Sequence, residues 1–68
     1  MKKNQIRKFK DYAKVYIKDK SGKHTHTIID LEDVEKVSKY YWYLRDDGYV
    51  YSDEVGYMHY FIMGYIRF

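Results

Sequence analysis

The sequence predicts an α+β fold: a small antiparallel sheet of four to five strands with one short helix packed on one face. Several short segments alternate polar and apolar residues between turn-forming residues, which is typical of antiparallel strands. One segment between them repeats apolar residues at spacings of three and four, which is typical of a helix. At 68 residues the chain is long enough for one domain only, and its aromatic residues, 21% of the chain, can fill a small core.

A first hairpin is predicted over residues 12–29. Its first strand, residues 12–18, alternates in period two, so one face is expected to be buried. The turn that follows contains Gly22, which can adopt a positive φ. Residues 24–29 supply the second strand. The apolar positions of the first strand share one side: Ala13, Val15 and Ile17.

A short helix is predicted over about residues 31–40. Asp30 precedes it as an N-cap, and Asp33 lies near its positive end. Its apolar positions are expected to pack on the sheet: Leu31, Val34 and Val37.

A second hairpin is predicted from residues 41–44 and 49–51. The Asp47-Gly48 pair between them is a strong hairpin signal. Alternation places Trp42, Leu44 and Val50 on one face and the tyrosines on the other. Residues 57–63 fit either a last strand or a strand that passes into a helical turn, and periodicity does not separate the two.

The net charge of +3 is divided along the chain. Residues 1–23 carry nine Lys or Arg against two Asp, and residues 24–54 carry three against eight acidic residues. Residues 1–10 are predicted to be a flexible basic arm, and residues 11–68 a single domain. The basic end could meet a phosphate backbone, and the acidic middle could meet a basic protein groove.

Several classes of protein are not expected. The N-terminus lacks the apolar stretch of a signal peptide, and no run approaches the roughly 20 apolar residues of a membrane span. Cysteine is absent, so neither a disulfide nor a thiolate metal site is available. We expect a soluble, cytoplasmic protein that does not bind a membrane and uses no cofactor, metal or small-molecule substrate.

Four segments carry a resemblance to a known family. In order, they are Ile29-Asp30-Leu31-Glu32-Asp33, Lys39-Tyr40-Tyr41-Trp42-Tyr43, Gly48-Tyr49-Val50 and Tyr57-Met58-His59. Together they resemble the amino-terminal module of phage-type HNH endonucleases. The resemblance implies a small sheet with a helix, often joined in phage genomes to a DNA-binding sheet domain.

The resemblance also implies where the chemistry would lie. In the family, the segment that supplies the catalytic histidine and the metal-binding groups follows the position of Gly64, and here four residues follow it. Tyr60 replaces the family's usual arginine, and the histidine matched by His59 is not the metal-activating one. We therefore expect a binding module without a nuclease, and no enzymatic activity.

The outward tyrosines and the basic end form the first candidate site, for nucleic acid. Aromatic rings offer stacking surfaces to unpaired bases, and basic side chains neutralise phosphates. Tyrosine also fills half-buried sheet surfaces, so some of these rings are expected in the core. The candidate residues are Arg7, Lys8, Lys10, Lys14, Tyr16, Lys18, Tyr41, Tyr43, Tyr49 and Tyr51.

Two further sets are candidates for protein contacts. Carboxylates on the helix and two turns could imitate spaced phosphates and bind a basic protein; they are Glu32, Glu35, Asp46, Asp47, Asp53 and Glu54. The tail carries more apolar surface than a small sheet covers, which predicts a homodimer interface. Its residues are Met58, Phe61, Ile62, Met63, Ile66 and Phe68. His24 and His26 share one side of a strand, but they are expected to be surface residues because further metal ligands are lacking.

Three functions are expected from these patterns together with the resemblance. The first, implied by the resemblance, is a phage-derived binding protein that acts on a nucleoprotein machine in the cytoplasm of a bacterial host cell, as inhibitors of bacterial defence nucleases of the anti-CRISPR type do. The second is a DNA- or RNA-binding accessory module that uses the tyrosine and lysine face. The third is a split or residual HNH nuclease that needs a partner chain.

Overall fold

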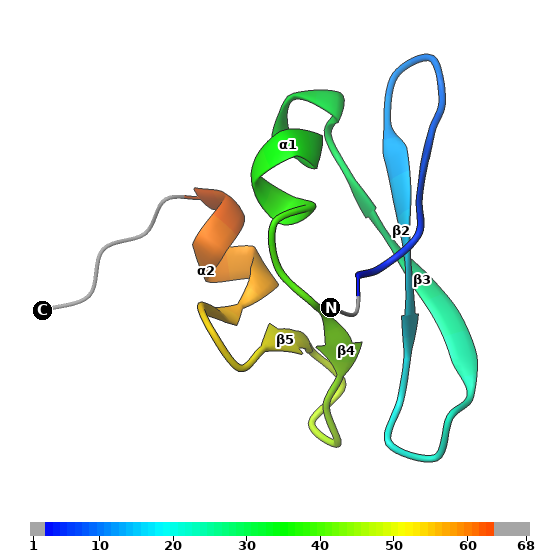
Figure 1. Cartoon of the computed structure of the whole chain (residues 1–68), viewed down its shortest axis with the longest axis vertical. Coiled ribbons are helices and arrows are strands. Elements are labelled where there is room, and N and C mark those ends of the chain that lie inside the picture. Colours follow the sequence, from blue (N-terminus) through cyan, green and yellow to red (C-terminus); the bar gives the residue numbers. More distant parts are fainter. Residues whose placement is uncertain (1–2, 64–68) are drawn as a thin grey trace, which may run out of the picture.

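Two three-stranded antiparallel sheets share one core in this computed structural model, which describes residues 3–63 (Figure 1). Sheet A has the order β1-β2-β3, and sheet B has the order β4-β5-β6. A short helical segment joins the sheets and a second helix follows sheet B; both helices lie on the same side of sheet A (Figure 1). The small α+β fold is therefore confirmed.

Sheet A is built as a meander around β2. Its strands are β1 (Ile6–Lys8), β2 (Ala13–Lys18) and β3 (His24–Ile29). The expected alternation in β2 is confirmed, because its three apolar residues are buried. The β2–β3 turn is held by the Asp19 carboxylate, which accepts hydrogen bonds from Ser21 N–H, Ser21 O–H and Lys23 N–H, while Gly22 adopts φ 89°.

The joining helix is shorter than predicted. It consists of a 3₁₀ turn, η1 (Leu31–Asp33), followed by α1 (Val34–Val37). Its end is fixed by groups from outside the helix. The indole N–H of Trp42 donates to Val37 O at 2.8 Å, and the Lys3 ammonium donates to Ser38 O and Lys39 O, both at 3.2 Å. These contacts satisfy carbonyls that a helix end leaves without partners.

Sheet B is small and leads directly into the second helix. Its strands are β4 (Tyr43–Leu44), β5 (Val50–Ser52) and β6 (Gly56–Tyr57), and α2 (Met58–Met63) follows. The Asp-Gly hairpin is confirmed, with Gly48 at φ 87°. For the last segment, the alternative of a strand passing into a helix is the observed one.

The core lies between the inner faces of the two sheets. Trp42 is fully buried at its centre, and Leu44 and Val50 from sheet B pack against the same cluster. The ring of Phe61 from α2 lies 5.5 Å from the ring of Trp42, between centroids. The buried members of the cluster are Ala13, Val15, Ile17, Ile29, Val37, Trp42 and Met58.

Asn4 fastens sheet A to the start of sheet B. Its amide nitrogen donates to Tyr16 O at 3.0 Å and to Trp42 O at 2.8 Å, and its amide oxygen accepts from Trp42 N–H at 2.7 Å. One side chain thus satisfies three backbone groups on two segments far apart in sequence. Such pairing matters because a buried backbone group without a partner is costly.

Two expectations about the fold need correction. The prediction of a flexible arm over residues 1–10 is wrong for its described part, because Ile6–Lys8 pairs with β2 and Asn4 holds the chain that precedes it. The single sheet of four to five strands with one helix is only roughly matched. The helical segment carries the chain away from the edge of β3, so the later strands pair only with one another.

Replacing Asn4 by alanine removes all three side-chain hydrogen bonds. We expect Asn4→Ala to lower the free energy of unfolding by about 2 kcal/mol, because the N–H and C=O of Trp42 lose their partner. Urea unfolding followed by the fluorescence of the single tryptophan measures this change.

The neighbouring Gln5 provides the matched control. Its side chain is exposed and makes no hydrogen bond within residues 3–63. We expect Gln5→Ala to change the free energy of unfolding by less than about 0.5 kcal/mol. Equal effects of the two substitutions on the free energy of unfolding would show that the hydrogen bonds of Asn4 do not stabilise the fold.

Candidate nucleic-acid interface

The outer face of sheet A gathers basic and aromatic side chains. Because side chains alternate along each strand, the residues next to the buried ones point outward and meet across the strands. The register aligns Arg7 with Lys14 and Lys14 with Ile28. It also aligns Tyr16 with His26 and Lys18 with His24. The outer face therefore consists of Arg7, Lys14, Tyr16, Lys18, His24, His26 and Ile28.

Phe9 and Tyr12 extend this face at the β1–β2 turn. Their rings are stacked, with centroids 4.9 Å apart and planes 18° apart. The Arg7 guanidinium carbon and the Lys14 ammonium nitrogen lie 5.4 Å and 5.6 Å from the Phe9 centroid. These cation–π contacts hold cations and rings together on one surface.

The basic side chains of this face have no acidic partner among the described residues. None of Arg7, Lys14 and Lys18 forms an ion pair with a residue in the range 3–63. No strand position of the face carries a carboxylate; the nearest acidic residues occupy the turns. Of these, Asp19 is engaged in its own turn, where the Ser21 hydroxyl and then the Lys23 N–H hold its pKa below the usual value.

A pocket of about 180 Å³ opens at the end of the face nearest the β2–β3 turn. Tyr16, Lys18 and His24 of the outer face line it together with the exposed Gln5 and with Tyr41. Rings, an amide, an imidazole and an ammonium group therefore converge there. This is the donor set and the stacking surface that an unpaired nucleotide uses.

The structure divides the residues predicted for nucleic acid between the two sheets. Arg7, Lys14, Tyr16 and Lys18 lie together on sheet A, and Tyr41 joins them at the pocket. Lys8 is exposed at the end of β1 and Lys10 in the following turn. The expectation of one combined surface is wrong for Tyr43, Tyr49 and Tyr51, which belong to the β4–β5 hairpin of sheet B.

The outer face of sheet B is a tyrosine cluster. The register aligns Tyr43 with Tyr51 and Tyr51 with Tyr57. The Arg45 guanidinium carbon lies 4.5 Å from the Tyr51 centroid and 5.8 Å from the Tyr57 centroid. Tyr49 is also near, at 6.1 Å from Tyr57 between ring centroids. These rings therefore contact one another and one cation, and several are already engaged within the molecule.

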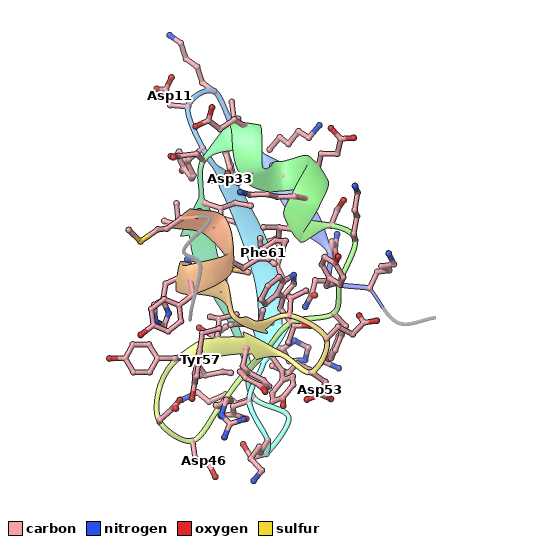
Figure 2. The ribbon with its side chains drawn as sticks, turned by 90° about the vertical axis from the view of Figure 1, so that its left-hand side faces the viewer. Asp11, Asp33, Asp46, Asp53, Tyr57 and Phe61 are labelled. Carbon is pink, nitrogen blue, oxygen red and sulfur yellow. The ribbon has the colours of Figure 1, made fainter. Side chains whose placement is uncertain are left out.

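Carboxylates hold two of these tyrosine hydroxyls. Tyr57 O–H donates to Asp47 Oδ2 at 2.7 Å, and Tyr43 O–H donates to Asp53 Oδ1 at 2.9 Å. The bond to Asp47 raises the pKa of Tyr57, and the bond to Asp53 raises the pKa of Tyr43, because an ionised phenol would face a carboxylate. Figure 2 shows Tyr57, Asp53 and Asp46 spread around this sheet.

The six acidic residues predicted to bind protein do not all remain free. Asp46 pairs with Lys20 at 3.3 Å, and Asp47 and Asp53 accept the tyrosine hydrogen bonds. The others are exposed at separate places: Glu32 in η1, Glu35 in α1, and Glu54 in the β5–β6 turn. Half of the set therefore has hydrogen-bond or ion-pair partners within the molecule.

The predicted oligomer surface is mostly core. Met58 is buried, so its expected role at an interface is wrong, and Phe61 and Ile62 pack against the core cluster. Only Met63, with 76% of its surface exposed, fits the expectation among the described residues. Ile66 and Phe68 lie outside the described residues.

No group of three or more His, Cys, Asp or Glu side chains within residues 3–63 is placed to hold a metal ion. No helix in the described part is long and apolar enough to cross a membrane.

No protein-family model matches the chain, and no curated protein or solved structure matches it. The resemblance to the HNH module thus stays a prediction that depends on the residues quoted above.

Sequence reasoning missed Phe9 and the two histidines as members of the basic face. The signal for Phe9 was its place two residues after Arg7, since residues at that spacing share a strand face. The sequence predicts a flexible arm over residues 1–10, and an arm has no strand faces, so the spacing alone does not place Phe9 beside Arg7.

The Tyr57–Asp47 hydrogen bond generates a prediction about titration. It is the largest cause of the lowered pKa of Asp47, so Tyr57→Phe should raise that pKa toward the ordinary carboxyl value. Because the folded-state pKa is lowered, this contact stabilises the fold above the unfolded-state pKa. Its contribution is lost as the pH falls through the folded-state pKa.

NMR titration of the Asp47 carboxyl carbon measures the change. Tyr43→Phe is the matched control, because it removes an equivalent hydroxyl whose partner is Asp53. We expect no change in the Asp47 pKa in that variant. An unchanged Asp47 pKa in Tyr57→Phe would rule out the hydrogen bond as its cause.

Proposed function

We propose that this chain is a non-enzymatic binding module that holds single-stranded nucleic acid on the outer face of sheet A. The observation that carries the proposal is the composition of that face. Aromatic rings alternate there with cations that form no ion pair among residues 3–63, and no carboxylate lies at a strand position of the face. Proteins that bind single strands without strict sequence preference combine a basic surface with rings on which bases stack.

The geometry favours a single strand over a duplex. A base can reach the rings of Phe9, Tyr12 and Tyr16 only where its own faces are unpaired and unstacked. The cations flank these rings, with Arg7 and Lys14 beside Phe9 and Lys18 beside the pocket. Phosphates of a strand whose bases lie on the rings would therefore meet positive charge on either side.

The tyrosines of sheet B support this function less. Two of their hydroxyls are bonded to carboxylates, and the surrounding turns carry Asp46 and Glu54. Negative charge beside stacking surfaces repels phosphate. Charge therefore favours sheet A as the surface that meets nucleic acid.

Inhibition of a defence nuclease by phosphate mimicry stays a prediction with less support from the geometry. Mimicry calls for spaced, available carboxylates, whereas three of the six acidic residues are engaged within the molecule. A module that grips the nucleic acid of a nucleoprotein machine is compatible with the sheet A face. A split nuclease likewise stays a prediction, and no observation on residues 3–63 favours it.

Substitution of Tyr16 tests the stacking surface. We expect Tyr16→Ala to weaken binding of an oligothymidine of about 12 nucleotides by roughly 5- to 100-fold, since one base–ring stack contributes about 1–3 kcal/mol. Fluorescence anisotropy of the labelled strand measures the affinity. Tyr49→Ala, an exposed tyrosine on the other hairpin, is the matched control and should leave the affinity unchanged.

Substitution of Lys18 tests the phosphate contacts. We expect Lys18→Ala to reduce the slope of log affinity against log salt by about 0.7, the value for one phosphate contact on a single strand. Lys39→Ala removes an exposed lysine just after α1 and should leave the slope unchanged. Absence of any binding at about 50 mM salt would reject the proposed function.

A further inference from the structure

The edge strands of the two sheets differ in how they are protected. Strands β1, β4 and β6 have three, two and two residues, and β1 carries Arg7 and Lys8. Strand β3 has six residues, His-Thr-His-Thr-Ile-Ile, with no Lys, Arg, Asp, Glu, Gly or Pro. Proteins usually blunt sheet edges with short strands, charge, proline or bulges, because an open edge pairs with other strands. Strand β3 has none of these protections.

Alternation identifies the backbone groups that β3 leaves open. Tyr16 N–H bonds to Gln5 O, so Tyr16 and Lys14 direct their backbone groups toward β1. The residues between them on β2 therefore bond to β3, through Thr25, Thr27 and Ile29. The remaining residues of β3 direct their N–H and C=O groups to the open edge; they are His24, His26 and Ile28.

Among residues 3–63, no strand pairs with this edge. A groove of about 280 Å³ runs between Thr27–Ile29 and the neighbouring Tyr49, His59 and Ile62. The side chain of Ile28 is 59% exposed at this edge. An added strand would cover this side chain and satisfy the open backbone groups together.

We propose that β3 pairs antiparallel with β3 of a second copy of this chain, about a two-fold axis at His26. A second copy fits because β3 is itself an extended, uncharged strand, so the two edges meet without like charges. The register centred on His26 is the one that pairs every open residue: His26 with His26, and His24 with Ile28 of the other copy. Because the two-fold contact uses the same strand of both copies, it forms a closed dimer and leaves neither β3 edge open.

The pairing would change the surface on which the proposed function rests. It joins two copies of sheet A into one continuous sheet, with both basic faces on the same side. A bound strand would then cross from one copy to the other at the histidines. Dimer formation itself does not depend on the nucleic-acid proposal, since the open edge of β3 exists without it.

Sedimentation velocity of the full chain at about 10 to 500 µM, at one fixed pH, measures the oligomeric state. We expect a monomer–dimer equilibrium. His26→Lys should raise the dissociation constant about ten-fold or more, because it places like charges directly opposite each other at the axis. His24→Lys makes the same change on the same strand, but it faces Ile28 of the other copy and should have a much smaller effect.

Amide hydrogen exchange on the unmodified chain gives a second measurement that needs no variant. We expect the N–H groups of His24, His26 and Ile28 to become more protected as the concentration rises. A chain that stays monomeric up to about 0.5 mM overturns the proposal. A dimer whose β3 amides gain no protection, or one that His24→Lys weakens as much as His26→Lys, overturns it too.

These outcomes are separate from those of the nucleic-acid test. A monomer that binds oligothymidine through Tyr16 would leave the proposed function standing and remove the β3 pairing. A β3 dimer that binds no nucleic acid would do the reverse.

Discussion

The fold depends on the anchoring of Trp42, which is buried completely between the two sheets. Its indole N–H holds the end of α1, and its backbone N–H and C=O are held by Asn4 from the start of the chain. Four hydrogen bonds of Trp42 and Asn4 thus connect sheet A, α1 and the start of sheet B. A chain this short buries too little surface to be stable by apolar contact alone, so each satisfied polar group in the core matters.

The anchoring also decides where function can lie. Both inner faces are committed to the core around Trp42, so the outer faces and the open edges of the sheets are left for binding. On sheet A the outer cations lack partners within residues 3–63, whereas on sheet B Arg45 sits over Tyr51, beside Asp47. Two surfaces rich in the same residue type therefore differ in chemistry. On sheet A, Arg7 and Lys14 lie beside the Phe9 ring without a carboxylate partner in this range. On sheet B, Arg45 lies over a ring and is also paired with a carboxylate.

The basic and acidic residues, which are separated along the sequence, also lie in different sheets. Residues 3–29, which form sheet A and its turns, hold eight basic and two acidic residues, and residues 43–57, which form sheet B, hold one basic and four acidic residues. Lys20 and Asp46 pair where the two parts approach each other. Such a field orients the molecule on approach to a phosphate backbone, so that sheet A meets it first. Under the proposed function, the same field would keep nucleic acid away from the tyrosines of sheet B.

The sequence alone determined the local structure: the alternation of β2, the hairpins at Gly22 and Gly48, and the inward position of Trp42. These follow from steric and periodic rules that act over a few residues. It also predicted residues of the face proposed here to bind nucleic acid, namely Arg7, Lys14, Tyr16 and Lys18. Only the tertiary structure decided which of them lie together. Leu31 was expected to pack inward but is 38% exposed, and Ile6–Lys8 became a strand rather than an arm, because β2 and Trp42 offered backbone partners from distant parts of the chain. The same long-range pairing divided the strands into two sheets and left β3 with an open edge, and no pattern confined to neighbouring residues encodes that choice.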